Sequence, residues 1–220
     1  MVNRRPTLIA ALTLTAAAAL TLSACGSDDS SKDSDNDKIA GADTGKETSQ
    51  SPSPSSADVA GRPKITFPSD AKNVFEYEKT GDAAKDAALS DSTLSVKSLN
   101  EAIFKGSTGT KALGFYNTDK ALESSITYVQ RFIDSGDTWV GEIRYFNYDV
   151  KLSGKAKAYV TYCSDESKAY VKHRKTQKVD KEAATANSYV LYHSSLTKNA
   201  DGVWQTANVV SDRGDKACQP

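Results

Sequence analysis

Cysteine carries the most reactive side chain of this sequence and occurs at three positions. Cys25 follows an apolar N-terminal segment, whereas Cys163 and Cys218 lie in the last third of the chain. A thiol can be acylated, oxidised to a disulfide or bound to a metal. In an exported protein, an odd number of cysteines leaves one without a disulfide partner. The N-terminal segment therefore decides which chemistry is open to each cysteine.

The first residues have the layout of an export signal. Arg4 and Arg5 give a basic start, an apolar run covers residues 8–22, and small residues precede Cys25, an order typical of secretory signal peptides. The run is short for a membrane span of ~20 residues. Two adjacent arginines also occur in twin-arginine signals. Thr7 stands where that motif prefers phenylalanine, so the general secretory route is expected.

The tetrapeptide Leu22-Ser23-Ala24-Cys25 resembles the lipobox of bacterial lipoproteins. The resemblance implies that residues 1–24 are cleaved off and that the Cys25 thiol carries a diacylglyceryl group with palmitate-like chains. Two acyl chains, at ~0.8 kcal/mol per buried CH₂, hold a protein stably on a membrane. The mature protein is then expected on the extracytoplasmic face of the bacterial plasma membrane. The alternative is an ordinary signal peptide cut before another small residue, with Cys25 incidental.

With Cys25 lipidated, Cys163 and Cys218 remain as a candidate disulfide, which an exported setting favours. Closing a loop of this length contributes roughly 4 kcal/mol by chain-entropy reasoning. Two free thiols are the alternative. Because the chain has only two histidines and two of its sulfurs are expected to be bonded, a transition-metal site is poorly supplied. Phosphate-loop, zinc-protease and nucleophile-elbow motifs are missing from the sequence, so we expect no metal and no cofactor.

Residues 25–63 form a linker in front of one expected domain, residues 64–220. The linker is rich in Ser and Asp and no aromatic residue precedes Phe67, so it cannot bury enough apolar surface to order itself. As a flexible coil it would span roughly 35 Å. The chain has 28 basic and 28 acidic residues, and this balance argues against a nucleic-acid partner.

In the first part of the expected domain, apolar residues recur with the spacing of helices. Residues 82–104 fit a helix that residues 90–93 weaken, and residues 118–136 fit a second. The second carries one apolar stripe, formed by Leu122, Ile126, Val129 and Ile133. The period then changes to two, which predicts strands at 138–152, 155–164, 169–176, 187–198 and 203–211. Helices followed by an antiparallel meander indicate an α+β fold.

The passages "ALESSITYVQRFIDSGDTWVGEIRYFNYDV" and "GVWQTANVV", in this order of elements, resemble nuclear-transport-factor-2-like lipoproteins of actinobacteria. The resemblance implies a cone, in which N-terminal helices pack on a curved antiparallel sheet around a cavity. That fold hosts isomerases, dehydratases, binding modules and dimer platforms, so it does not fix the function.

Enzymes with this cone often place an Asp or His beside Tyr in the cavity. The resemblance therefore implies candidate catalytic residues, which are Tyr145, Asp149, Tyr189 and His193. Strict alternation puts Ile143, Tyr145, Asn147 and Asp149 on one strand face, and Tyr189, Leu191 and His193 on another. A general base there needs an apolar pocket that raises its pKa. The alternative is a half-buried sheet face with polar ends in solvent.

Eight of the ten tyrosines lie between Tyr128 and Tyr192. Tyrosine combines apolar area with a polar tip, which suits the binding of small ligands, glycans or proteins, although strands also favour tyrosine in general. A basic run could face wall polymer or lipid headgroups, or form a solvated hairpin between acidic flanks. Its members are Lys168, Lys172, Arg174, Lys175, Lys178 and Lys181.

The sequence thus favours a non-enzymatic, lipid-anchored domain that binds a ligand or partner at the cell envelope. A small molecule, a wall polymer or a protein could be bound, with Tyr145, Tyr189 and His193 as contacts. One alternative is an acid–base enzyme of isomerase or dehydratase type that uses a cone cavity. Another is a structural surface protein that self-associates, for example as a homodimer.

Overall fold

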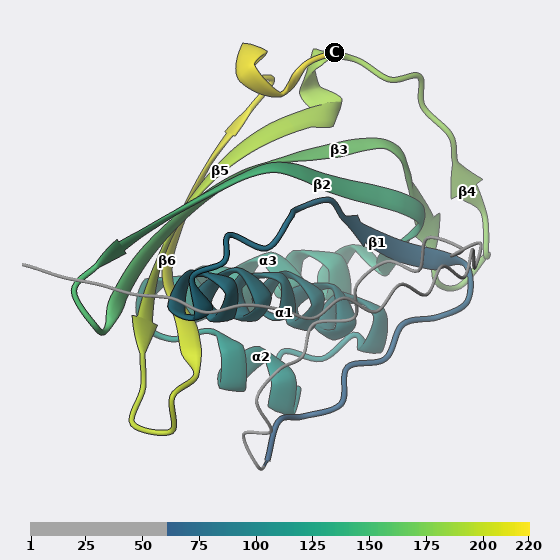
Figure 1. Cartoon of the computed structure of the whole chain (residues 1–220). Coiled ribbons are helices and arrows are strands. Elements are labelled where there is room, and N and C mark those ends of the chain that lie inside the picture. Colours follow the sequence, from purple (N-terminus) through teal and green to yellow (C-terminus); the bar gives the residue numbers. More distant parts are fainter. Residues whose placement is uncertain (1–60) are drawn as a thin grey trace, which may run out of the picture. The chain divides into compact units, whose positions relative to one another are not determined.

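The computed structural model describes residues 61–220. The predicted signal peptide, Cys25 and nearly all of the predicted linker lie outside the described residues. Within residues 61–220, six strands form one curved sheet, and the helices pack on its concave side (Figure 1). This is the predicted α+β architecture.

Figure 1 labels the α-helices and the strands. The helices are α1 (Ala83–Lys105), α2 (Lys111–Tyr116) and α3 (Asp119–Ser135), with short 3₁₀ turns η1 (Ala186–Ser188) and η2 (Lys216–Cys218). The strands are β1 (Ala71–Phe75), β2 (Asp137–Ser153), β3 (Lys157–His173), β4 (Val179–Asp180), β5 (Tyr189–Lys198) and β6 (Trp204–Arg213).

The strand order is β1-β2-β3-β5-β6, with β4 paired to β3. All pairs are antiparallel except β1 with β2, which is parallel. The sheet is therefore mixed, and the prediction of a purely antiparallel sheet was wrong at this edge.

The strands predicted at 155–164 and 169–176 form one long strand, β3. The polar residues between them were predicted to interrupt the strand, yet they pair with β2. Asp165 lies opposite Arg144 and Lys168 opposite Glu142. Opposite charges on directly paired positions stabilise a sheet, so these residues continue the strand.

Helix α1 is continuous through residues 90–93, where the sequence suggested a weak point. Its polar side chains are buried and satisfied locally. The Thr93 hydroxyl donates to the Ser90 carbonyl at 2.8 Å, and the Ser98 hydroxyl donates to the Ser95 carbonyl at 2.7 Å. The Asn117 amide, which follows α2, accepts from Ser95 and donates to Ser98. Buried hydroxyls that find such partners need not interrupt a helix.

Helix α3 begins after Thr118 and ends at Gly136, as predicted. The predicted apolar stripe is only partly buried, because Val129 is fully buried whereas Ile126 is 39% exposed. The face turned to the core carries Ala121, Leu122 and Phe132 in place of Ile126. The prediction that Ile126 faces the core was wrong, because the side of α3 that carries Phe132 packs against the core instead.

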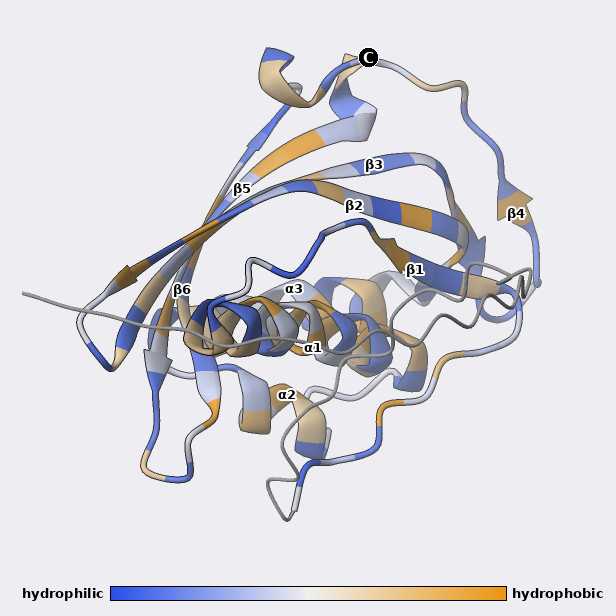
Figure 2. Cartoon of the chain, viewed as in Figure 1, coloured by the Kyte–Doolittle hydropathy of each residue, from blue (hydrophilic) through white to orange (hydrophobic). Residues whose placement is uncertain are grey.

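The core lies between α1 and the concave face of the sheet. Large buried side chains from the sheet include Trp139, Val160, Leu196 and Trp204, which belong to one cluster with Ile103 of α1. Hydrophobic and hydrophilic residues alternate along the strands in Figure 2, as expected when one face is buried.

Two irregularities interrupt the pairing of β2 with β3, the first with an extra residue in β3 and the second with an extra residue in β2. Register shifts lie between Glu142 and Arg144 and between Phe146 and Asp149. At the first, Gly141 has φ +98°, and a Cβ there would lie 2.1 Å from the Lys168 carbonyl oxygen. Bulges of this kind increase curvature and change which face a side chain occupies. They therefore give the sheet its concave shape.

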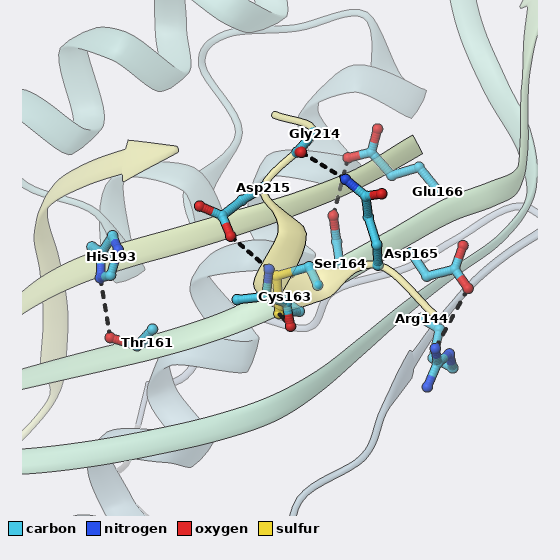
Figure 3. Close-up of a disulfide and its surroundings, with 12 residues drawn as sticks. Arg144, Thr161, Cys163, Ser164, Asp165, Glu166, His193, Gly214 and Asp215 are labelled. Atoms are coloured by element: carbon cyan, nitrogen blue, oxygen red, sulfur yellow. Dashed lines mark hydrogen bonds and ion pairs between the residues drawn. A yellow bond between two sulfur atoms is a disulfide. The ribbon is translucent and has the colours of Figure 1, made fainter. Parts of the chain in front are cut away.

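Cys163 and Cys218 form a disulfide, which confirms the predicted pair. Cys163 comes from β3 and Cys218 from η2, and both are 2% exposed. The Gln219 amide donates to the Gly214 carbonyl at 2.8 Å beside it (Figure 3). The bond pins the C-terminal segment to the sheet.

No helix between residues 61 and 220 has the length and apolar character that a membrane span requires.

Candidate functional site

The predicted site residues lie on two faces of the sheet. Tyr145 is 6% exposed within the core cluster. Asp149 is paired directly with Thr161, and Thr161 directly with His193. Directly paired side chains share a face. The Thr161 hydroxyl and His193 Nδ1 are 3.2 Å apart in solvent (Figure 3), so this row belongs to the outer, convex face.

The second bulge of β2 separates Tyr145 from Asp149. Asn147 has φ +53°, and β2 uses one residue more than β3 between the pairs Phe146–Cys163 and Asp149–Thr161. The extra residue turns Tyr148 inward and leaves Asp149 outward. The prediction that Tyr145 and Asp149 share a face was wrong because simple alternation ignores the bulge. Tyr189 and His193 lie on the same convex face of β5, so neither of them lies close to Tyr145.

Three tyrosines from adjacent strands stack across the concave face. The ring centroids of Tyr148 and Tyr162 are 5.1 Å apart with planes 16° apart, and those of Tyr162 and Tyr192 are 5.0 Å apart at 13°. Tyr145 meets the Tyr162 ring edge-on at 6.1 Å. We call Tyr148, Tyr162 and Tyr192 the tyrosine ladder.

Burial sets the protonation state of these phenols. It raises the pKa of Tyr162 and, well above the ordinary value, the pKa of Tyr145, Tyr148 and Tyr192. The nearby Glu166 carboxylate raises the pKa of Tyr145 and Tyr192 further. All four stay neutral at physiological pH. They can donate a hydrogen bond to a ligand but cannot act there as a general base.

One end of the tyrosine ladder borders an open hollow between β2 and the segment that follows β1. We call it the bulge hollow. Its apolar floor consists of Tyr77, Tyr148, Leu89 and Val150, and the rings of Tyr77 and Tyr148 are 5.3 Å apart. The Tyr148 hydroxyl is shielded from solvent and has no hydrogen-bond partner among residues 61–220. Its rim carries acceptors and donors, namely Glu76, Glu78, Lys79, Thr80, Lys85, Asn147 and Asp149.

The other end of the ladder carries a polar cluster. Glu166 accepts hydrogen bonds from the Ser164 hydroxyl at 3.3 Å and the Tyr192 hydroxyl at 3.5 Å, and it pairs with Arg213 at 2.8 Å. Figure 3 shows the contact between Ser164 and Glu166. Tyr128 of α3 is 43% exposed. Its pKa is raised by burial and by Glu166, so it adds a neutral phenol near this cluster.

One amide of helix α1 contacts both Tyr145 and Trp139 of β2. The Trp139 indole donates to Asn100 Oδ1 at 3.2 Å, and Asn100 Nδ2 donates to the Tyr145 hydroxyl at 3.5 Å. Asn100 is 5% exposed, so this contact fixes the orientation of Tyr145.

Sequence reasoning missed Tyr148, Tyr162, Glu166 and Arg213. The alternation of Ala158, Val160 and Tyr162 was visible, and its extension by two steps would have placed Ser164 and Glu166 on the same face. Tyr148 had no such signal, because its face depends on the bulge.

The basic run is largely engaged within the protein. Lys172 pairs with Asp70 at 2.9 Å, and Lys178 pairs with Asp180 at 2.7 Å. The Arg174 guanidinium donates to the carbonyls of Phe104 at 3.0 Å and Asp137 at 2.9 Å, and also to that of Ile103. Arg174 therefore caps the C-terminus of α1, where a cation is favourable.

No group of three or more His, Cys, Asp or Glu side chains within residues 61–220 is arranged to hold a metal ion.

Comparison with known proteins gives structural matches only. No protein-family model matches the chain, and no curated protein matches it. A ketosteroid isomerase-like protein from Erwinia carotovora atroseptica has 14% identity and a TM-score of 0.40, over 60% of this chain and 97% of that one. A putative ketosteroid isomerase from Shewanella frigidimarina has 13% identity and a TM-score of 0.32, over 59% and 98%.

A third match is the intermembrane space region of the chloroplast protein ARC6, with 10% identity and a TM-score of 0.36 over 57% of this chain and 96% of that one. Identities and TM-scores this low say nothing about the activity of this chain. Its function has to be inferred from its own residues.

Proposed function

We propose that the protein is a lipid-anchored binding domain on the extracytoplasmic face of the plasma membrane. Its ligand would lie in the bulge hollow, against the exposed end of the tyrosine ladder. The observation that carries the proposal is the stack of three neutral tyrosines that leads from the core to an open hollow.

Binding fits the geometry better than acid–base catalysis. His193 stands in the convex row, away from the hollow, and Asp149 points outward at the rim of the hollow, where it pairs with Lys151 at 3.4 Å. Glu166 does approach the ladder, but it is paired with Arg213 and already accepts two hydroxyl donors. The isomerase-type alternative would need one of these groups free beside the tyrosines.

The lining of the bulge hollow suggests an uncharged ligand with an apolar face and several hydroxyl groups. Ligand sites combine an apolar surface with a few polar groups that fix orientation. The floor supplies aromatic and aliphatic surface, and the rim supplies both carboxylates and ammonium groups. Hydroxyl groups can accept from lysines and donate to carboxylates, so a polyhydroxyl compound such as a sugar would satisfy both.

The anchor is proposed from the sequence Leu22-Ser23-Ala24-Cys25. A diacylglyceryl group would keep the domain at the membrane without a spanning helix. A binding domain held there would meet ligands that belong to the envelope or pass through it.

Native mass spectrometry of the mature chain, extracted from membranes in a mild detergent, tests the proposed ligand site. We expect a non-covalent adduct on the wild type that disappears on denaturation. Tyr148→Ala should lose it, whereas Tyr159→Ala should keep it, because Tyr159 is 52% exposed on the convex face. Tyr148→Phe removes only the hydroxyl, which is shielded from solvent, and keeps the ring, so it controls for loss of folding and should retain the adduct. A bare wild-type mass, or an adduct equally strong in all three variants, would overturn the proposal.

A further inference from the structure

His173, the last residue of β3, is held between two carboxylates from two other strands. Its Nδ1 is 2.6 Å from Asp137 Oδ1 of β2, and its Nε2 is 2.8 Å from Asp180 Oδ2 of β4. An ionised carboxylate only accepts hydrogen bonds, so each ring nitrogen must carry a proton to make both contacts. The geometry therefore requires the imidazolium form.

The residues after His173 form an exposed connection to β5, and we call residues 174–188 the strap. The strap arcs outside the sheet from β4 toward β5 (Figure 1). Its regular strand pairing with β3 is limited to Asp180 with Val171 and Val179 with Lys172. Residues 181–187 are all exposed. Arg174, the first residue of the strap, is held separately by hydrogen bonds to the carbonyls of Phe104 and Asp137. The His173–Asp180 contact adds a side-chain attachment where β4 pairs with β3.

The far end of the strap has a different anchor. Arg213 donates to the Asn187 carbonyl at 2.6 Å, and the Gly214 amide donates to the Tyr189 carbonyl at 2.7 Å. Arginine stays protonated at any pH that the fold tolerates. The contact of the strap with His173 therefore depends on pH, whereas its contact with Arg213 does not.

The charged groups near His173 each have a contact partner. Asp180 also contacts Lys178, at 2.7 Å, from within the strap. From β3 and its continuation, Lys172 is engaged with Asp70, and Arg174 with the carbonyls at the end of α1 and with that of Asp137. Neither cation contacts the imidazole. The contacts with Asp180 and then Asp137 raise the pKa of His173.

We propose that His173 is a pH-sensitive latch that holds β4 of the strap against β3 while the ring is an imidazolium and releases β4 when the ring loses a proton. A neutral ring has one donor, so one of the two carboxylates loses its hydrogen bond. Asp137 and Asp180 then face each other across a neutral ring. The strap opens at β4 while Arg213 keeps its other end in place.

The direction in which pH moves the latch follows from the linkage between protonation and opening. A group whose pKa is higher in the closed state stabilises that state below the pKa of the open state. This stabilisation is lost as the pH rises through the closed-state pKa. The opening equilibrium increases about tenfold for each unit by which the two pKa values differ. The latch is thus closed in acid to neutral conditions and open in alkaline conditions.

The chain contains only two histidines, which makes the test simple. Proton NMR of the mature chain should show the His173 imidazole titrating above the ordinary histidine value of 6.5, with His193→Gln used to assign its signals. Hydrogen exchange of peptides from the strap, corrected for the intrinsic pH dependence of exchange, should accelerate over the pH range in which His173 titrates. Peptides from α1 should not change.

Three variants separate the latch from a general loss of stability. His173→Gln should leave the strap unprotected at every pH, whereas His193→Gln should behave as the wild type. Asp180→Asn keeps the size of the side chain but removes one charge, so it should move the His173 titration and the strap opening to lower pH together. Titration of His173 at or below the ordinary histidine value of 6.5, or strap exchange that does not follow the protonation of His173, would overturn the proposal.

Discussion

The carboxylate of Asp91, in the middle of α1, is paired with the guanidinium of Arg62, near the start of the described chain. Asp91 Oδ2 lies 3.2 Å from Arg62 Nη2, and it also accepts the Trp204 backbone N–H at 2.9 Å. The Asp91 side chain is 2% exposed and that of Arg62 is 19% exposed. One carboxylate therefore joins the N-terminal segment, α1 and β6.

Asp91→Ala should lower the free energy of unfolding by ~3 kcal/mol, because truncation of one partner of a buried ion pair leaves the other unpaired and typically costs ~3–5 kcal/mol. Because the Arg62 side chain is 19% exposed, we expect a loss of stability at the low end of this range. Urea denaturation followed by circular dichroism measures it. Lys72→Ala is the matched control, since the Lys72 side chain of the Lys72–Glu142 pair is 67% exposed and its loss should matter by less than ~1 kcal/mol. Equal losses in the two variants would contradict the structural role of Asp91.

Gly141→Ala should destabilise the domain by several times more than Gly154→Ala. Both glycines have positive φ, which costs an alanine about 1–2 kcal/mol. Only at Gly141 would the new methyl group collide with backbone, 2.1 Å from the Lys168 carbonyl oxygen, whereas nothing lies within 4 Å at Gly154. Thermal unfolding of the two variants compares them directly. Similar melting temperatures would mean that the bulge can relax.

Cys218→Ser should lower the free energy of unfolding by ~2–5 kcal/mol, the usual effect of removing a native disulfide. Addition of a reductant should destabilise the wild type to a similar extent and should leave Cys218→Ser unchanged. Intact mass with and without reduction verifies the bond. A reductant effect of equal size on both proteins would show that the reductant acts elsewhere.

The closed state of the strap should have a bell-shaped pH profile. Contacts with Lys178 and then His173 lower the pKa of Asp180 below its ordinary value of 3.8, so that carboxylate stabilises the latch above that pH and fails as the pH falls through its lowered pKa. His173 gives the alkaline limb, above its ordinary value of 6.5. Hydrogen exchange of the strap, measured from well below pH 3.8 into the alkaline range, checks the shape. A profile with an alkaline limb in His173→Gln would contradict it.

Cys25→Ala should move the protein from the membrane fraction to the soluble fraction and abolish incorporation of a labelled fatty acid. The physical reason is the loss of both acyl chains, which leaves no apolar anchor. Cys218→Ser should keep label and location, because that thiol belongs to the disulfide. Retention of the label in Cys25→Ala would place the lipid elsewhere.

The sequence allowed the fold class and its local elements to be predicted where one signal dominates. Helix α3 ends at Gly136 as expected, because a glycine readily adopts the left-handed conformation of a helix C-terminus. It also begins after Thr118 as expected, although the Thr118 side chain makes no capping hydrogen bond. The alternation after Gly136 identified the strands, and the cysteine count identified the disulfide partners. These features depend on neighbours within a few residues, or on the elimination of a third cysteine.

The site was less predictable because it depends on register. Tyr148 faces the ladder only because Asn147 adds a residue to β2, and Tyr162 and Tyr192 stack on it only because three strands align at that point. The continuity of β3 depends on charges that Arg144 and Glu142 supply from another strand. Such long-range pairings leave no periodic trace in a single strand.

The Arg62–Asp91 pair also has a mechanical consequence. Traction on the N-terminal side of the domain would reach Arg62 before it reached any strand of the sheet. The load would then pass through Asp91 to the middle of α1 and, by the Trp204 amide, to β6. The domain would resist such pulling with its best-buried helix and an edge strand loaded together, so that β1 would not be peeled from the sheet first.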